Sequence, residues 1–251
     1  MSLTLFDQTL RLLSIVLAAA ILYRIIEQRL FTSPLNSFAV MLGVVLARDA
    51  AVSIPRYDSH AYTLVWEVSL PILLLAQLWA GLDTLLSIAR LYETFGNFAT
   101  RLYLWCLGAS IVICSATLPR ELARASGGEA VLRELFLLQR CIDSLIAGTL
   151  ILASAFLLRH LAPPRRPPRN LVMHTVFLSL YFVGYSALFL VENLTVLGGA
   201  AMAERIQFVL IVLLYFAWAC GLSSEGAIGE PWPHVEVVVL QPLSPPPPRP
   251  L

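Results

Sequence analysis

Residues 62–92 read YTLVWEVSLPILLLAQLWAGLDTLLSIARLY, and this stretch decides the fold. Its only charged side chains are those of Glu67, Asp83 and Arg90. About 17–25 mainly apolar residues, rising about 1.5 Å each, cross the roughly 30 Å of hydrocarbon in a bilayer. The stretch therefore predicts a transmembrane helix that is longer than one crossing needs and that tilts or projects from the bilayer. Pro71 marks a position where this helix can kink.

Six further apolar stretches have the length of a membrane span. They run from Leu10 to Ile26, Phe38 to Ile54, Leu102 to Leu118, Leu135 to Leu161, Leu171 to Val191 and Ile206 to Leu222. We expect the fourth span along the chain to be stopped by Pro119. In lipid every backbone amide needs an internal partner, and the alternation of a β-barrel is missing. The sequence thus predicts an all-α polytopic membrane bundle of about seven transmembrane helices.

The composition agrees with lipid as the solvent. Of the 251 residues, 58% are hydrophobic and 13% charged, whereas a soluble domain carries roughly 25% charged residues. The net charge of +1 gives no reason to expect nucleic acid as a partner. All the basic residues are arginine. Without lysine no Schiff base to retinal or pyridoxal phosphate can form, and no phosphate-loop lysine exists.

The chain divides into residues 1–224, a seven-helix transmembrane domain, and residues 225–251, a proline-rich tail that we expect to be disordered and polyproline-like. Orientation follows from arginines near the span ends. The least compensated group lies between the fifth and sixth spans and comprises Arg159, Arg165, Arg166 and Arg169. It predicts a multi-pass cell-membrane protein with its N-terminus outside and its C-terminus in the cytoplasm.

Ionisable side chains are expensive within a membrane and by default suggest a functional site. Because successive spans run in opposite directions, many of those in this chain fall toward one membrane face. The candidate ligand-binding residues of this layer are Arg48, Asp49, Glu67, Arg140, Asp143 and Glu192, with Glu204 and Gln207 at the same level. Its arginines suit a carboxylate or phosphate, and its acids suit a cation or proton. The alternative is ion pairing that fixes helix register, since Arg140 and Asp143 lie three residues apart on one helix.

The other half of the bundle holds fewer such groups. Asp83 and Arg90 share a helix face and are expected to pair, and His174 enters the sixth span at a similar depth. A proton path from Asp83 through Gln77 to the Arg48 layer is the alternative interpretation.

No catalytic constellation is visible. The histidines lack metal-ligand spacing and there is no Gly-x-Ser-x-Gly elbow, so we expect no catalytic residue, metal or cofactor. The cysteines have no Cys-x-x-Cys spacing and are expected to be small buried hydrophobes. Tryptophans and tyrosines are interpreted as packing and interface anchors.

Several motifs are similar to those of one known group. Leu22-Tyr23-Arg24, Leu30-Phe31 with Pro34, Tyr62 with Trp66, and Gln139-Arg140 together resemble small seven-helix proteins of bacterial genomes, especially acidobacterial ones. That group usually has an acidic residue where this chain has Gln139. Because no activity is assigned to the group, the resemblance implies only the architecture.

The sequence favours a non-enzymatic, receptor-like or partner-binding membrane module that senses a small molecule at the polar layer. A small transporter or permease using the same layer as its substrate site is the alternative, and an intramembrane enzyme is third. The lipid bilayer is the expected partner, with another membrane or signalling protein as a further candidate.

Overall fold

The computed structural model describes residues 5–30, 34–53, 60–122, 129–160, 167–194 and 199–223, and these form seven α-helices without a strand. The helices are α1 (Leu5–Glu27), α2 (Leu35–Ser53), α3 (His60–Leu91), α4 (Glu93–Leu122), α5 (Glu129–Arg159), α6 (Arg169–Leu194) and α7 (Gly199–Gly221). The prediction of an all-α chain is confirmed. The proline-rich tail, residues 225–251, lies outside the described residues, as does most of the linker 162–169.

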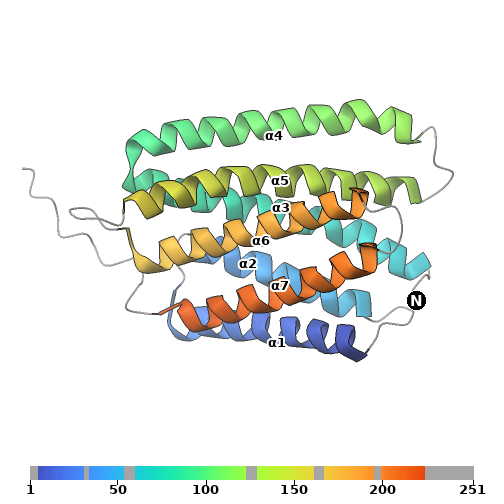
Figure 1. The fold of residues 1–251 in the computed structure, drawn as a ribbon, viewed down its shortest axis with the longest axis horizontal. Coiled ribbons are helices and arrows are strands. Elements are labelled where there is room, and N and C mark those ends of the chain that lie inside the picture. Colours follow the sequence, from blue (N-terminus) through green and yellow to red (C-terminus); the bar gives the residue numbers. More distant parts are fainter. Residues whose placement is uncertain are drawn as a thin grey trace, which may run out of the picture.

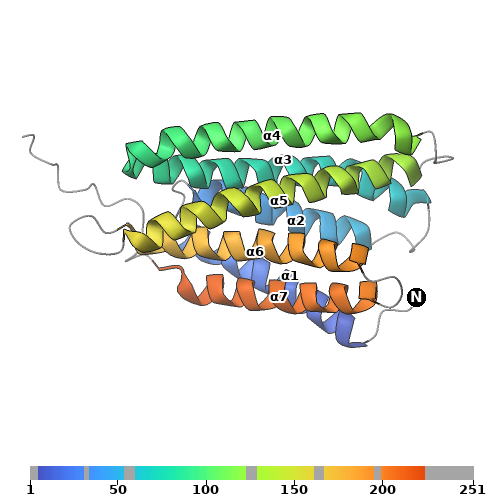
Figure 2. The same ribbon diagram turned by 45° about the horizontal axis from the view of Figure 1, so that its top comes forward.

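The helices lie side by side along one long axis (Figure 1). Contacts connect α1 to α2 and α7, α2 to α3, α3 to α5, α5 to α6 and α6 to α7, so six helices form a closed ring. The remaining helix, α4, packs outside the ring against α3 and α5, and it lies at the edge of the bundle in both ribbon views (Figures 1 and 2). The interior of the six-helix ring is therefore where a buried site can form.

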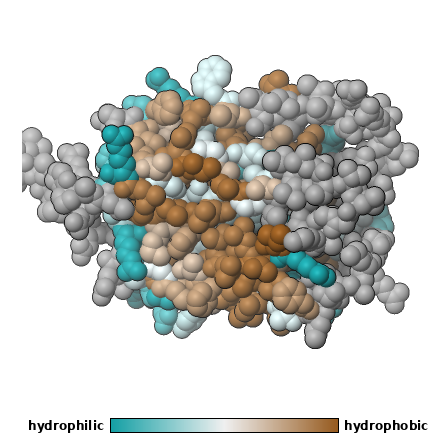
Figure 3. Space-filling view, in the orientation of Figure 1, coloured by the Kyte–Doolittle hydropathy of each residue, from teal (hydrophilic) through white to brown (hydrophobic). Residues whose placement is uncertain are grey.

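Four of the helices are long and apolar enough to cross a membrane. Among the described residues these candidate spans are Gln8–Glu27, Leu35–Val52, His60–Leu91 and Glu134–Arg159, and Arg205–Gly221 is a shorter apolar segment. Figure 3 shows hydrophobic side chains over the middle of one face and hydrophilic ones at its left edge. Trp105 and Leu75 are 78% and 69% exposed on the bundle's surface. Large apolar surfaces of this kind are rare on proteins that face only water.

The connection between α3 and α4 is tighter than the sequence suggested. Only Tyr92 separates the two helices, and its carbonyl accepts hydrogen bonds from the amides of Phe95 and Gly96. A β-carbon on Gly96 would lie 2.3 Å from the Cβ and 2.9 Å from the Cα of Ala89. Glycine is therefore required for the two helices to approach this closely.

The expectation that Pro119 stops the fourth span is wrong, because α4 continues to Leu122. Pro71 likewise lies inside α3. Proline removes one amide donor and crowds the preceding turn, but helices in membranes tolerate it where neighbouring groups satisfy the freed carbonyl.

The end of α1 is a Schellman motif, which reverses the chain toward α2. The amide of Leu30 donates to the carbonyl of Ile25 at 2.9 Å, and that of Arg29 donates to Ile26 at 3.1 Å. Arg29 takes the left-handed conformation with φ of 53°, a position that glycine usually fills. Leu30 and Ile25 are both buried and provide the apolar contact typical of this motif.

Candidate functional site

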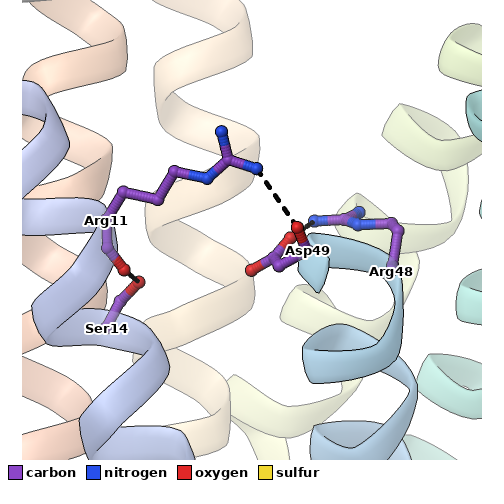
Figure 4. Close-up of polar contacts among 4 residues, drawn as sticks. All are labelled: Arg11, Ser14, Arg48 and Asp49. Atoms are coloured by element: carbon purple, nitrogen blue, oxygen red, sulfur yellow. Dashed lines mark hydrogen bonds and ion pairs between the residues drawn. The ribbon is translucent and has the colours of Figure 1, made fainter. Parts of the chain in front are cut away.

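The charged pair Arg48 and Asp49 lies near the end of α2. Nη2 of Arg48 is 3.2 Å from Oδ1 of Asp49, and the guanidinium lies 5.0 Å from the ring centre of Trp66 on α3. Arg11 reaches across from α1 and donates to the main-chain carbonyl of Asp49 at 3.5 Å (Figure 4). Residues of α1, α2 and α3 therefore meet at this level of the bundle.

Three tyrosines extend this polar region into the interior. The ring of Tyr185 on α6 packs against that of Tyr181, one turn away, with centroids 4.7 Å apart, and Tyr185 also lies close to Gln207 of α7. The rings of Tyr181 and Tyr215 on α7 are stacked, with centroids 6.5 Å apart. Arg48 lies close enough to Tyr185 to act on its hydroxyl electrostatically. Tyr185 thus lies between the charged pair on α2 and the other aromatic side chains of the α6–α7 interface.

Asp143 of α5 is the buried acid of this region. Its side chain is completely buried, and among the described residues neither carboxylate oxygen has a hydrogen-bond partner. Tyr181 and Tyr185 lie within electrostatic range of it. We use the name polar cluster for the group formed by Arg48, Asp49, Asp143, Tyr181, Tyr185, Gln207 and Tyr215.

An unpartnered buried carboxyl is costly, because desolvation of a polar group is offset only by hydrogen bonds or opposite charge. The carboxylate of Asp143 accepts no hydrogen bond from Arg140. The ion pair between Arg140 and Asp143, expected as the purely structural alternative, is therefore absent from the described residues.

The predicted site residues fall into two groups. Arg48, Asp49 and Asp143 come together around Tyr185, as the antiparallel arrangement of the spans led us to expect. Glu67 is partly buried beside Trp66 in sequence on α3, and Arg140 is partly buried one turn before Asp143. Glu192 belongs to α6, but its side chain lies outside the described part of the chain. Whether any of them binds a ligand stays a prediction.

The tyrosines were missed as site residues, since aromatic side chains in a membrane are most often packing or interface anchors. One signal was present in the sequence. Tyr181 and Tyr185 are four residues apart, so they share a helix face, and Tyr215 sits near the middle of the following apolar segment.

A second polar group lies toward the other end of the bundle. Oγ of Ser37 on α2 donates to Oδ2 of Asp83 on α3 at 2.8 Å, so Asp83 has a hydroxyl partner from a neighbouring helix. Next to it, Oγ1 of Thr84 lies 3.3 Å from Nε2 of His174 on α6. His174 is fully buried, and the ring of Phe38 packs edge-on against it at 4.9 Å.

Gln77, which we proposed as an intermediate between the two ends, is 1% exposed, and its Oε1 has no partner among the described residues. It lies on α3 about two turns before Thr84. The bundle interior therefore carries polar side chains at several depths.

The part of the chain that the structure describes contains no cluster of metal ligands. No group of three or more His, Cys, Asp or Glu side chains is placed to hold an ion there. Cys106, Cys141 and Cys220 are free thiols, and none of the three is fully buried, in contrast to our expectation.

Comparison with known proteins adds no relative: no protein-family model, no curated protein and no solved structure matches the chain.

Proposed function

We propose that this chain is a multi-pass cell-membrane protein of seven spans, N-terminus outside, which acts as a receptor-like module binding a small polar ligand at the polar cluster. The four candidate spans support the membrane assignment. The arginine-rich connection between α5 and α6 supports the orientation. The sequence contains no arrangement of catalytic residues that would favour an enzyme over a receptor.

The observation that carries the proposal is the unpartnered carboxylate of Asp143. Four helices of the ring supply the polar cluster, namely α2, α5, α6 and α7, yet none gives this carboxylate a hydrogen bond within the described residues. A buried polar group that a fold retains without a partner destabilises that fold. Ligand binding explains its presence, because a bound donor or cation would satisfy it.

The polar cluster offers both signs of charge and several hydroxyls. Arg48 can bind a carboxylate or phosphate through parallel N–H bonds, and Asp143 can bind a cation or an N–H donor. The hydroxyls of Tyr181, Tyr185 and Tyr215 can both donate and accept. A small ligand carrying an anionic and a donor group fits this arrangement.

Cysteine accessibility tests the proposal. In a variant with the native cysteines replaced by serine, Gln207→Cys should react in intact cells with a membrane-impermeant methanethiosulfonate reagent, because a ligand reaching the polar cluster from outside needs an aqueous route. Ser179→Cys, a buried position on α6 toward the opposite half, is the matched control and should stay unmodified. If Gln207→Cys reacts neither in intact nor in lysed cells, the polar cluster is sealed and the proposal fails.

A small permease is the second candidate, favoured by the pairs Ser37–Asp83 and Thr84–His174 and by buried Gln77. These residues extend the polar interior beyond the polar cluster, as a path for protons or substrate would require. Proteoliposomes carrying an internal pH dye distinguish the candidates. A permease coupled to protons makes the vesicle pH follow an imposed gradient, and His174→Phe stops it, whereas a receptor leaves the gradient intact.

A further inference from the structure

A groove opens between α2 and α3 beside the polar cluster. Its volume is about 430 Å³, within the range of roughly 300–1,000 Å³ typical of small-molecule sites. Its walls are mainly apolar and include Val44, Ala47, Ala51, Leu64, Val68 and Ile72.

The groove opens sideways, away from the centre of the ring. Leu64, Val68 and Ile72 line it, and each has at least half of its surface exposed. In a bilayer these side chains would face acyl chains, so a ligand can enter from lipid without crossing the headgroup region. An apolar site with a few placed polar groups is the usual design of a ligand pocket.

Arg48 is the charged residue of the lining, and Ser69 is the polar uncharged one. The guanidinium has five N–H donors. One is used in the bond to Asp49, and the buried Nε has no partner among the described residues. Trp66 holds the cation from one face. A cation with unused donors in an apolar wall is complementary to an anion, and a carboxylate matches a guanidinium with two parallel bonds.

The dimensions restrict the apolar part of the ligand. From Leu64 to Ile72 the groove follows α3 for about 12 Å, at about 1.5 Å of rise per residue. A groove of this length and volume matches a single hydrocarbon chain better than the two chains of a phospholipid.

We infer that the groove between α2 and α3 binds a single-chain amphiphile with a carboxylate head, a long-chain fatty acid, whose head pairs with Arg48 and whose chain lies along Val44 and Ile72. The inference goes beyond the proposed function, because the groove is a second site, open to lipid, that shares only Arg48 with the polar cluster. The ligand would join the polar cluster to the surrounding lipid.

Fluorescence quenching tests the inference, since Trp66 lies against Arg48. The full chain in nanodiscs of zwitterionic phospholipid is titrated with 9,10-dibromostearic acid, whose bromines quench tryptophan on contact. Subtracting the signal of Trp66→Phe isolates the Trp66 component. We expect this component to be quenched saturably by the acid, and not saturably by its methyl ester, which lacks the charge.

Two variants separate the groove from simple partitioning into lipid. Arg48→Gln should weaken the saturable quenching about tenfold or more, because it removes a charge-assisted hydrogen bond. Val68→Phe should abolish it by filling the groove while leaving Arg48 in place. Arg101→Gln, an exposed arginine on α4, is the matched control and should behave as wild type.

Quenching that is linear in ligand and equal in all variants would overturn the inference, and so would equal binding of the methyl ester. Stronger saturable quenching by brominated phosphatidylglycerol would also overturn it, by assigning the groove to a phospholipid. Each of these results leaves the accessibility of Gln207→Cys unaffected. The proposed function and the fatty-acid inference can therefore fail separately.

Discussion

Replacing Asp143 by leucine should make the protein more stable, although the substituted side chain lies inside the bundle. Leucine has the same number and branching of heavy atoms as aspartate and no polar atom. The carboxylate of Asp143 is completely buried and, within the described residues, has no hydrogen-bond partner. A residue kept at a cost in stability is characteristic of a functional site.

The expected rise in Tm follows from the missing hydrogen-bond partner of Asp143. An unsatisfied buried polar group costs about 1–3 kcal/mol, and for a chain of this size each kcal/mol shifts Tm by about 2–4 °C. Asp143→Leu should therefore raise Tm by at least about 2 °C. Asp143→Asn, which keeps an unsatisfied polar group at the same position, should raise it less.

Asp83 provides the matched control, because it is also an acid inside a span but accepts a hydrogen bond from Ser37 at 2.8 Å. Asp83→Leu removes a satisfied group, so we expect Tm to fall, by an amount corresponding to about 0.5–3 kcal/mol. Both variants are measured by intrinsic fluorescence during thermal unfolding in one detergent. If Asp143→Leu lowers Tm as much as Asp83→Leu, then Asp143 stabilises the bundle and the argument for a ligand at the polar cluster is refuted.

Three further predictions concern orientation and local structure. In a cysteine-free background, His60→Cys should react with an impermeant maleimide on intact cells, and Arg159→Cys should react only after permeabilisation. The reason is that these two exposed positions lie at opposite ends of the bundle. The reverse pattern would show that the orientation is the opposite one. Gly96→Ala should lower the free energy of unfolding by about 1–3 kcal/mol, because the added carbon clashes at the α3–α4 turn. Gly108→Ala is the control and should cost nothing, since no atom lies within 4 Å of the added carbon. Equal Tm values for the two variants would show that the turn relaxes freely. Arg29→Gly should raise Tm, because the left-handed conformation costs an ordinary residue about 1–2 kcal/mol, and a fall in Tm would mean that the arginine side chain contributes more than the strain.

The helices could be predicted from the sequence because their apolar stretches are long. The stretch 62–92 reads as a single helix, and α3 covers nearly all of it. The ends were harder to predict. Pro119 is followed by three more helical residues, and the break between α3 and α4 falls at Tyr92, where nothing in the local composition forces it.

The polar cluster could be predicted only in part. Charged residues such as Arg48 and Asp143 are conspicuous in an apolar span, and alternating span directions place them at one end. The tyrosines are different, since which face of a helix points inward depends on its rotation. For a membrane helix both faces are apolar, so the hydrophobic periodicity that fixes rotation in a soluble protein is weak. The contacts of Tyr181 and Tyr215 therefore had to come from the structure.

Extraction of membranes shows whether lipid surrounds the exposed apolar side chains of α1 to α7. Membranes from cells producing the full chain are washed with alkaline carbonate, and the pellet is then extracted with or without detergent. We expect the chain to stay in the washed pellet and to leave it only with detergent. Recovery of a monodisperse chain in plain buffer would contradict it.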